Sequence, residues 1–455
     1  MRLRTTTALA ALLAAGVAPV TLSAPASAAT GPYTADFNGD GHADAVAPSP
    51  NASTSGKWWS GAVGVVYGSS AGVGRTASVS QNSTGVPGSA EESDGFGQAV
   101  AVGDLDKDGY SDLAVGAPQE QVGDDVSGGT VVIVWGSPTG LKGATTVKDP
   151  AVSGHDRWGQ ALAIGDFTGD GRPDLAVGAS GTTQWIVKGG FTRSGTTGAN
   201  ISYTTSWTGS TGVLRLTAGK IDTDARADLL LGGRTRIASE RNLDHTYLYF
   251  GTASAPTKKT ELPYGKQLAV GDIDKDGYGD IVTGETQTAT GGDLETPGPA
   301  VVSHGTASGV GAPEALTDSG RPSLGDIDGD GRLDLALGHP DDSGIKSGNG
   351  TVLVQYGGAD GFGTPTRLTQ DTPGIPGAAE DNDFFGTAVL LTDLTGDGRA
   401  DLLAGSDGEN EADGLVHHLK GTATGLTTSG SAYYGPSAFA IPTAYDPSLG
   451  GVLVG

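Results

Sequence analysis

The sequence predicts an all-β protein, and within that class a seven-bladed β-propeller with four antiparallel strands per blade. A nine-residue, aspartate-rich pattern recurs seven times along the 455 residues. Short apolar runs bounded by glycine flank the copies, as expected of buried strands. Glycine accounts for 78 residues, which disfavours long helices because each interior glycine costs a helix about 1 kcal/mol. Radial repetition of one small sheet explains all three observations.

The spacing of the repeats distinguishes a ring from a linear stack. Copies of the pattern begin at residues 36, 104, 166, 220, 272, 326 and 393, so successive copies lie 52 to 68 residues apart. A linear β-solenoid, the alternative repeat fold, needs turns of regular length, and these unequal spacings disfavour it. Seven units fill the chain after residue 28 and leave no room for another domain.

Each unit also repeats its strands. An apolar run precedes the pattern at Ala99–Gly103 and Ala161–Gly165, and a second run follows it at Asp112–Gly116 and Asp174–Gly178. A third run ends in glycine, and a turn then leads to a weaker fourth run. Third runs are expected at Gly64–Gly68, Thr130–Gly136, Thr246–Gly251, Thr351–Gly357 and Leu415–Gly421.

The two ends of the chain are expected to share one blade. The first unit lacks an apolar run before its aspartate pattern, whereas the C-terminal Leu449–Gly455 resembles Trp158–Gly165. We therefore expect Val452–Gly455 to complete the blade that begins at residue 33, which removes a free sheet edge.

The aspartate pattern has the spacing of a calcium loop. Aspartates at positions 1, 3, 5 and 9 and a glycine at position 6 can supply the six or more oxygens that Ca²⁺ requires. Position 7 is expected to contribute its backbone carbonyl, at His42, Tyr110, Arg172, Tyr278, Arg332 and Arg399. Polar Asx turns are the alternative interpretation of a single copy, but six intact copies at one place in the repeat favour Ca²⁺. Magnesium is disfavoured because it retains its waters.

The fourth loop, residues 220–228, departs from the pattern. Position 1 is Lys220 and position 6 is Ala225, so we expect this loop to hold no metal and the chain to bind about six Ca²⁺ ions. The Lys220 ammonium could replace the ion among Asp222, Asp224 and Asp228. An EF-hand is excluded, because position 12 of the second loop is Val115 rather than glutamate and the flanking segments are strands.

Composition excludes several functions. The chain has 52 acidic and 27 basic residues, a formal net charge of −25, and the seven loops contain 24 of the acidic ones. Such a chain lacks the basic surface that nucleic acids and anionic membranes need. The absence of cysteine rules out disulfides, zinc-thiolate sites and a cysteine nucleophile.

Residues 1–28 have the features of a secretory signal peptide. Two arginines precede an apolar run, Ala8–Leu22, and Ala26–Ala28 fits a small-residue cleavage site. A membrane anchor is the alternative, but the run is short and contains Pro19. We expect a secreted, extracellular protein in which residues 29–455 form the propeller.

The segment from Phe96-Gly97 through the second loop to Gly116-Ala117-Pro118 resembles the FG-GAP repeat of integrin α-subunit propellers. Phe-Gly recurs at Phe385-Gly386 and is relaxed at Trp158-Gly159. The resemblance implies a seven-bladed propeller with calcium loops on one face. By this resemblance, the side-chain ligands would be Asp36, Asn38, Asp40 and Asp44; Asp104, Asp106, Asp108 and Asp112; Asp166, Thr168, Asp170 and Asp174; Asp272, Asp274, Asp276 and Asp280; Asp326, Asp328, Asp330 and Asp334; and Asp393, Thr395, Asp397 and Asp401.

The sequence favours binding over catalysis. The seven histidines form no metal-ligand motif, and Gly68–Gly72 matches a nucleophile elbow in letters but lies in an expected strand–strand turn. We expect a monomeric adhesion module for an extracellular protein or surface ligand, with no nucleic-acid partner and no membrane insertion. A lectin-like propeller is the alternative, since Trp58-Trp59 could stack on a sugar or could serve blade packing. An extracellular hydrolase is less favoured. Glycosylation sequons stand at Asn51, Asn82, Asn200 and Asn349.

Overall fold

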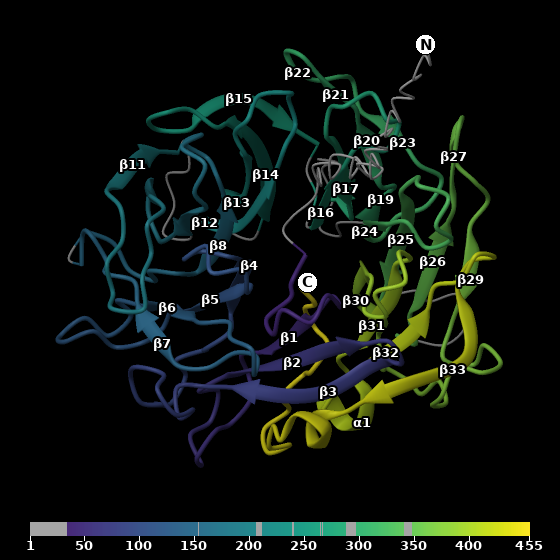
Figure 1. The fold of residues 1–455 in the computed structure, drawn as a ribbon, viewed down its shortest axis with the longest axis horizontal. Helices are drawn as coiled ribbons and strands as arrows, with labels where there is room; N and C mark the ends of the chain where they lie inside the picture. The colour runs from purple at the N-terminus through teal and green to yellow at the C-terminus, as the bar shows by residue number, and fades with distance from the viewer. Residues whose placement is uncertain are drawn as a thin grey trace, which may run out of the picture.

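Seven small sheets surround a central axis and confirm the predicted seven-bladed propeller (Figure 1). The computed structural model describes residues 34–152, 154–205, 212–238, 241–263, 265, 267–287, 297–340 and 348–455. The expected signal peptide lies outside these residues. Strands within each blade are antiparallel, and the first strand of a blade lies nearest the axis (Figure 1).

The blades follow one another in chain order. Their strands are β1 (Ala45–Ser49), β2 (Ala62–Ser69) and β3 (Gly72–Val79) in the first; β4 (Ala99–Gly103), β5 (Asp112–Ala117), β6 (Thr130–Val134) and β7 (Ala144–Thr146) in the second; β8 (Ala161–Gly165), β9 (Asp174–Gly178), β10 (Thr183–Val187) and β11 (Asn200–Thr204) in the third; β12 (Val213–Gly219), β13 (Asp228–Ala238), β14 (Arg241–Phe250) and β15 (Thr257–Leu262) in the fourth; β16 (Gln267–Gly271), β17 (Asp280–Gly284), β20 (Val301–Ser303) and β23 (Glu314–Ala315) in the fifth; β24 (Arg321–Gly325), β25 (Asp334–His339), β26 (Thr351–Gln355) and β29 (Thr366–Leu368) in the sixth; and β30 (Phe385–Thr392), β31 (Asp401–Ser406), β32 (Leu415–Lys420) and β33 (Thr427–Tyr434) in the seventh.

Short elements decorate the loops. Three two-stranded ribbons pair β18 (Thr286–Gln287) with β19 (Pro297–Gly298), β21 (Gly305–Thr306) with β22 (Gly309–Val310), and β27 (Gly357–Gly358) with β28 (Gly361–Phe362). The helical turns are α1 (Glu409–Ala412) and η1 (Pro436–Phe439). Among the described residues no helix combines the length and the apolar character that a bilayer crossing needs.

Each blade packs face to face on its neighbours, which explains the uninterrupted apolar runs. Every residue of β5, β9 and β17 is buried, because both faces of these strands are covered. The buried side chains form seven clusters, and each cluster joins two consecutive blades. The cluster between the seventh and first blades contains Leu403, Val66 and Leu449, so apolar packing continues around the whole ring.

The C-terminus completes the first blade, as predicted, and lies near the centre of the ring (Figure 1). Val46 donates its backbone N–H to the carbonyl of Val454 at 2.7 Å, and Val454 donates back to Val46 at 3.0 Å. Leu449 is fully buried and Leu453 is 9% exposed. This pair of residues makes one antiparallel bridge rather than a long strand.

The innermost strands line an apolar cavity of about 680 Å³ on the axis. Six blades contribute aliphatic side chains from their first strands, and the C-terminal segment contributes for the first blade. Among these side chains are Val100, Leu162, Leu216, Leu268, Leu324, Leu390 and Leu453.

Candidate metal centres

The aspartate loops all lie on one face of the propeller, because in six blades the loop connects the first strand to the second and in the first blade it leads into β1 beside the C-terminal segment. We call this face the loop face. Antiparallel strands place the connections from second to third strands, and those between blades, on the opposite face. The seven loops are therefore separate sites, one at the edge of each blade.

Six loops share one backbone conformation. Position 6 is a glycine with positive φ in each, and position 4 has positive φ even where it is Lys107 or Lys275. In the same six loops the N–H of position 6 donates to the position 1 carboxylate at 2.7–3.1 Å. Lysine rarely adopts this backbone, so the shared turn is strongly imposed by its surroundings.

Carboxylate oxygens converge inside three of these loops. Atoms from Asp104, Asp106 and Asp108 all lie within 4.8 Å of one another. The same holds for positions 1, 3 and 5 of the fifth loop and for positions 1, 3 and 9 of the sixth. Clustered, hydrogen-bonded carboxylates are the donor set that a hard cation such as Ca²⁺ binds, so the described residues fit the ion.

The aspartate at position 9 has a second role that the sequence did not reveal. In all seven blades its Oδ1 accepts the N–H of the glycine at the end of the third strand, at 2.7–3.0 Å. Its other oxygen accepts a backbone N–H at the start of the loop in six blades. The aspartate therefore fastens the loop to the third strand. Every repeat contains both an aspartate at position 9 and a glycine at the end of the third strand, and this joint recurrence in the sequence could have indicated the contact.

Burial perturbs these position 9 carboxyls. It raises the pKa of Asp44 and of Asp112 to about 7, and the pKa of Asp228 and of Asp334 to about 6. Neighbouring loop carboxylates push in the same direction. A bound cation acts oppositely, because it favours the charged form of a carboxyl.

The fourth loop is built differently, as expected from its sequence. Neither Thr223 nor Ala225 is among the described residues with positive φ. The predicted role of Lys220 is wrong: within the described structure its ammonium pairs with none of the loop carboxylates, and the Arg226 guanidinium pairs with Asp224 at 2.9 Å instead. Arg226 lies two residues after Asp224 and also donates its backbone N–H to this carboxylate.

Cationic side chains from outside the loop contact two of the intact loops. Arg193 reaches from the third blade to Asp106 at 3.2 Å and to Asp108 at 2.6 Å. Lys188 pairs with Asp170 at 3.2 Å. The sequence did not predict these contacts, because they join loops to residues far along the chain. A metal ion in the second loop would compete with Arg193 for two of its expected ligands.

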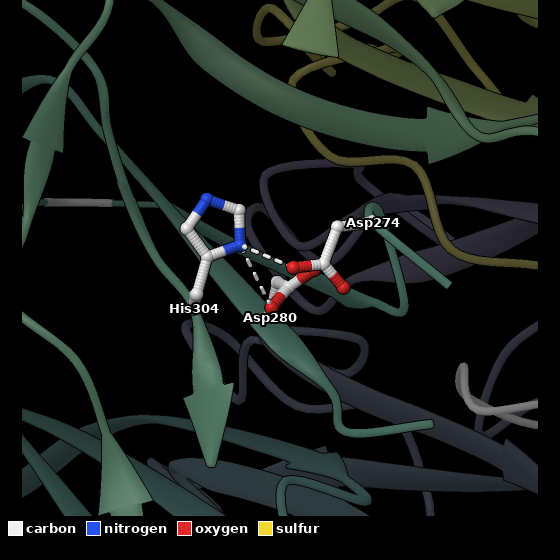
Figure 2. Close-up of side chains that lie close together, drawn as sticks. All are labelled: Asp274, Asp280 and His304. Carbon is white, nitrogen blue, oxygen red and sulfur yellow. Dashed lines mark ion pairs between the residues drawn. The ribbon is translucent and has the colours of Figure 1, made fainter. Parts of the chain in front are cut away.

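The fifth loop has a histidine neighbour. Figure 2 shows the His304 ring directed at Asp274 and Asp280, with Nδ1 3.5 Å and 3.2 Å from their carboxylate oxygens. His304 comes from the residue that follows β20, and the two aspartates from positions 3 and 9 of the loop. The histidine motifs in the sequence did not reveal this group, because His304 follows Asp280 by 24 residues and Asp274 by 30.

The other candidate residues lie elsewhere. Ser69 and Ser70 occupy the hairpin turn between β2 and β3, which is not the strand-to-helix turn of a nucleophile elbow. Trp58 and Trp59 are 42% and 47% exposed on the opposite face, with ring centroids 5.4 Å apart. These two rings are therefore available to a ligand and are not blade core.

Comparison with known proteins agrees with the fold and the loops. The FG-GAP repeat family model matches residues 96–134, 158–202 and 385–419, in the second, third and seventh blades. Phosphatidylinositol-glycan-specific phospholipase D of Mus musculus is 35% identical over 145 residues, which cover 32% of this chain and 17% of that protein. Integrin alpha-PS5 of Drosophila melanogaster is 39% identical over 94 residues, 19% of this chain and 9% of the integrin.

The architecture and its loops define the class: a seven-bladed β-propeller. Within that class three segments of the chain match the FG-GAP repeat model, and one part of the chain is similar to integrin alpha-PS5. It spans less than a fifth of the length of these relatives. A solved structure of rhamnogalacturonan lyase YesW aligns with a TM-score of 0.41 at 13% identity, covering 84% of this chain and 72% of the lyase.

Proposed function

We propose that this chain is a secreted, calcium-stabilised FG-GAP propeller that binds an extracellular protein or surface ligand through the face opposite the aspartate loops. One observation carries the choice of face. Six of the eight exposed large hydrophobic side chains in the described structure lie on loops of that face, and they are Trp58, Trp59, Val122, Val126, Val152 and Tyr445.

Calcium is proposed as the structural ion of six loops. The residues that would hold it are those at positions 1, 3, 5 and 9, with the position 7 carbonyl. Bound Ca²⁺ would neutralise carboxylates that otherwise repel one another at the edge of each blade. Elemental analysis of the dialysed protein is expected to find about six Ca²⁺ ions per chain, and a count of seven would contradict the empty fourth loop.

The binding proposal has a direct test. The full chain is immobilised and exposed to extracellular-matrix and cell-surface protein fractions, with and without a chelator. Replacing Trp58 and Trp59 by alanine is expected to abolish specific capture. Tyr433, 50% exposed on the outer strand β33, provides the matched control, since Tyr433→Ala removes an equally exposed ring away from that face. Equal capture by both variants would refute the assignment of the face.

A carbohydrate ligand is the second candidate. Two exposed tryptophan rings at 5.4 Å and an interplanar angle of 44° form an aromatic surface on which the C–H face of a sugar ring can pack. A glycan array on the same variants separates this from protein recognition. Hydrolase activity is a third possibility, because mouse phosphatidylinositol-glycan-specific phospholipase D shares similarity, but the match covers only 17% of that enzyme.

A further inference from the structure

We propose that the fifth loop is a mixed nitrogen–oxygen centre that prefers a transition-metal dication to Ca²⁺, with His304 as a ligand beside Asp274 and Asp280. The inference builds on the proposed metal role of the loops and assigns one of them a different ion. It rests on the placement of a single imidazole and on the distances around it.

The ring nitrogen is placed as a ligand would be. An ion bound by one nitrogen and one oxygen, each at about 2.1 Å, holds those two atoms about 3.0–3.4 Å apart. The Nδ1 of His304 lies 3.2 Å from an oxygen of Asp280 and 3.5 Å from one of Asp274 (Figure 2). The Asp280 separation lies inside the expected range, and the Asp274 separation exceeds its upper end by about 0.1 Å.

The same nitrogen lacks a hydrogen bond. Nδ1 of His304 is a buried atom with no hydrogen-bond partner of acceptable geometry, although two carboxylates flank it. The possible ligand atoms of Asp274, Asp280 and His304 all lie within 4.8 Å of one another, close enough to share one ion. A metal ion at that point would satisfy the nitrogen lone pair and both carboxylates.

The position of His304 in its blade distinguishes the fifth loop from the others. His304 directly precedes the glycine that donates to Asp280. The residue before the equivalent glycine is Tyr67, Trp135, Lys188, Phe250, Tyr356 or Lys420 in the other six blades. Lys188 confirms that this position faces the loop, because it pairs with Asp170. His418 faces a single loop carboxylate, Asp401, at 3.7 Å.

Ligand chemistry selects the ion. Carboxylate and carbonyl oxygens suit Ca²⁺, whereas imidazole suits zinc, cobalt, nickel and copper. Replacing one oxygen by a neutral nitrogen weakens the site for Ca²⁺ and strengthens it for borderline dications. Among the described residues, the fifth loop is the one where an imidazole and two loop carboxylates lie within 4.8 Å of one another.

Cobalt(II) is the probe, since its visible absorption reports on ligand type and number. The full-length secreted chain, freed of metal, is titrated with Co²⁺ in millimolar Ca²⁺ by calorimetry and by absorption. We expect one Co²⁺ per chain that resists Ca²⁺. His304→Tyr, which installs the residue of the first and sixth blades, should weaken this binding at least about tenfold. His245→Gln is the matched control. His245 also pairs with a carboxylate, that of Glu261, but it lies in β14 away from the strand end that faces the aspartate loop.

The outcomes separate this inference from the calcium proposal. About six Ca²⁺ ions together with no Ca²⁺-resistant Co²⁺ site, or a Co²⁺ site that survives His304→Tyr, would overturn this inference alone. If the chain binds no Ca²⁺ but binds Co²⁺ at a site that depends on His304, the calcium proposal is contradicted and this centre is supported. Thermal unfolding of the His304→Tyr variant in Ca²⁺ verifies that the blade is folded.

Discussion

Deleting Leu449–Gly455 should remove most of the stability of the propeller, because these residues close the ring. The segment makes two backbone hydrogen bonds with Val46, worth about 1 kcal/mol each. It also buries Leu449 and Leu453, worth about 1.5–3 kcal/mol each. The loss therefore amounts to roughly 5–8 kcal/mol, compared with the 5–15 kcal/mol by which whole domains are stable.

A graded series keeps this prediction measurable even where the truncated chain does not fold. Leu449→Ala should destabilise the protein by about 2–5 kcal/mol, since Leu449 is fully buried between the seventh and first blades. Val452→Ala is the control in the same segment: Val452 is 45% exposed, and its loss should cost no more than about 0.5 kcal/mol.

The assay is urea unfolding in saturating Ca²⁺, followed by tryptophan fluorescence. Ring closure predicts a large shift for the deletion, an intermediate shift for Leu449→Ala and almost none for Val452→Ala. If the truncated chain unfolds at the same urea concentration as the full chain, closure by the C-terminus contributes nothing and the reasoning is wrong.

Three further predictions concern the metal, the hydrogen-bonded position 9 aspartate of the fourth loop and a buried histidine. Chelation should lower the melting temperature sharply, since each site at a hundredfold excess of Ca²⁺ over its dissociation constant adds about 2.7 kcal/mol; an unchanged melt in calorimetry would count against structural calcium. Asp228→Ala should destabilise the fourth blade by about 2–4 kcal/mol, because it leaves the N–H groups of Ile221 and Gly251 without an acceptor. The number of bound Ca²⁺ ions should not change, and a lower number would show that this loop holds metal. Burial lowers the pKa of His417 to about 4 from its ordinary 6.5, so its contribution to stability is present above pH 6.5 and is lost as the pH falls towards 4. Between pH 7 and pH 5 this loss amounts to about 2 kcal/mol, and urea unfolding of His417→Phe at both values should show a pH dependence smaller by that amount, whereas an identical pH dependence would contradict it.

Much of the fold could be predicted from the sequence because it is repetitive. Seven copies of one pattern fixed the blade number, and the strands at Ala99–Gly103, Ala161–Gly165 and Asp174–Gly178 agree with the structure to the residue. Even ring closure was visible, since the C-terminal segment resembles the strand missing from the first unit. Because several copies of the repeat support the same assignment, a departure in one copy does not change it.

The loops were predictable as a pattern but not as contacts. The spacing of carboxylates and glycines indicated six similar turns and one aberrant turn, and the shared positive φ values agree. The pairing of Arg193 with the second loop was hidden, because the partners are 85 and 87 residues apart. The hydrogen bond from the third strand to each position 9 aspartate joins residues 15 to 25 apart, so the spacing within the nine-residue pattern did not reveal it.

Local sequence thus determined the strands, the turns and the carboxylates that each loop offers, because these depend on spacing along a few residues. Only the tertiary structure decided what faces each loop from the neighbouring strand. The third strand returns to its loop 23 to 25 residues later in five blades and brings a different side chain to an otherwise equivalent site. That side chain is a histidine at the fifth loop, and the chemistry that distinguishes one blade from the next follows from this packing.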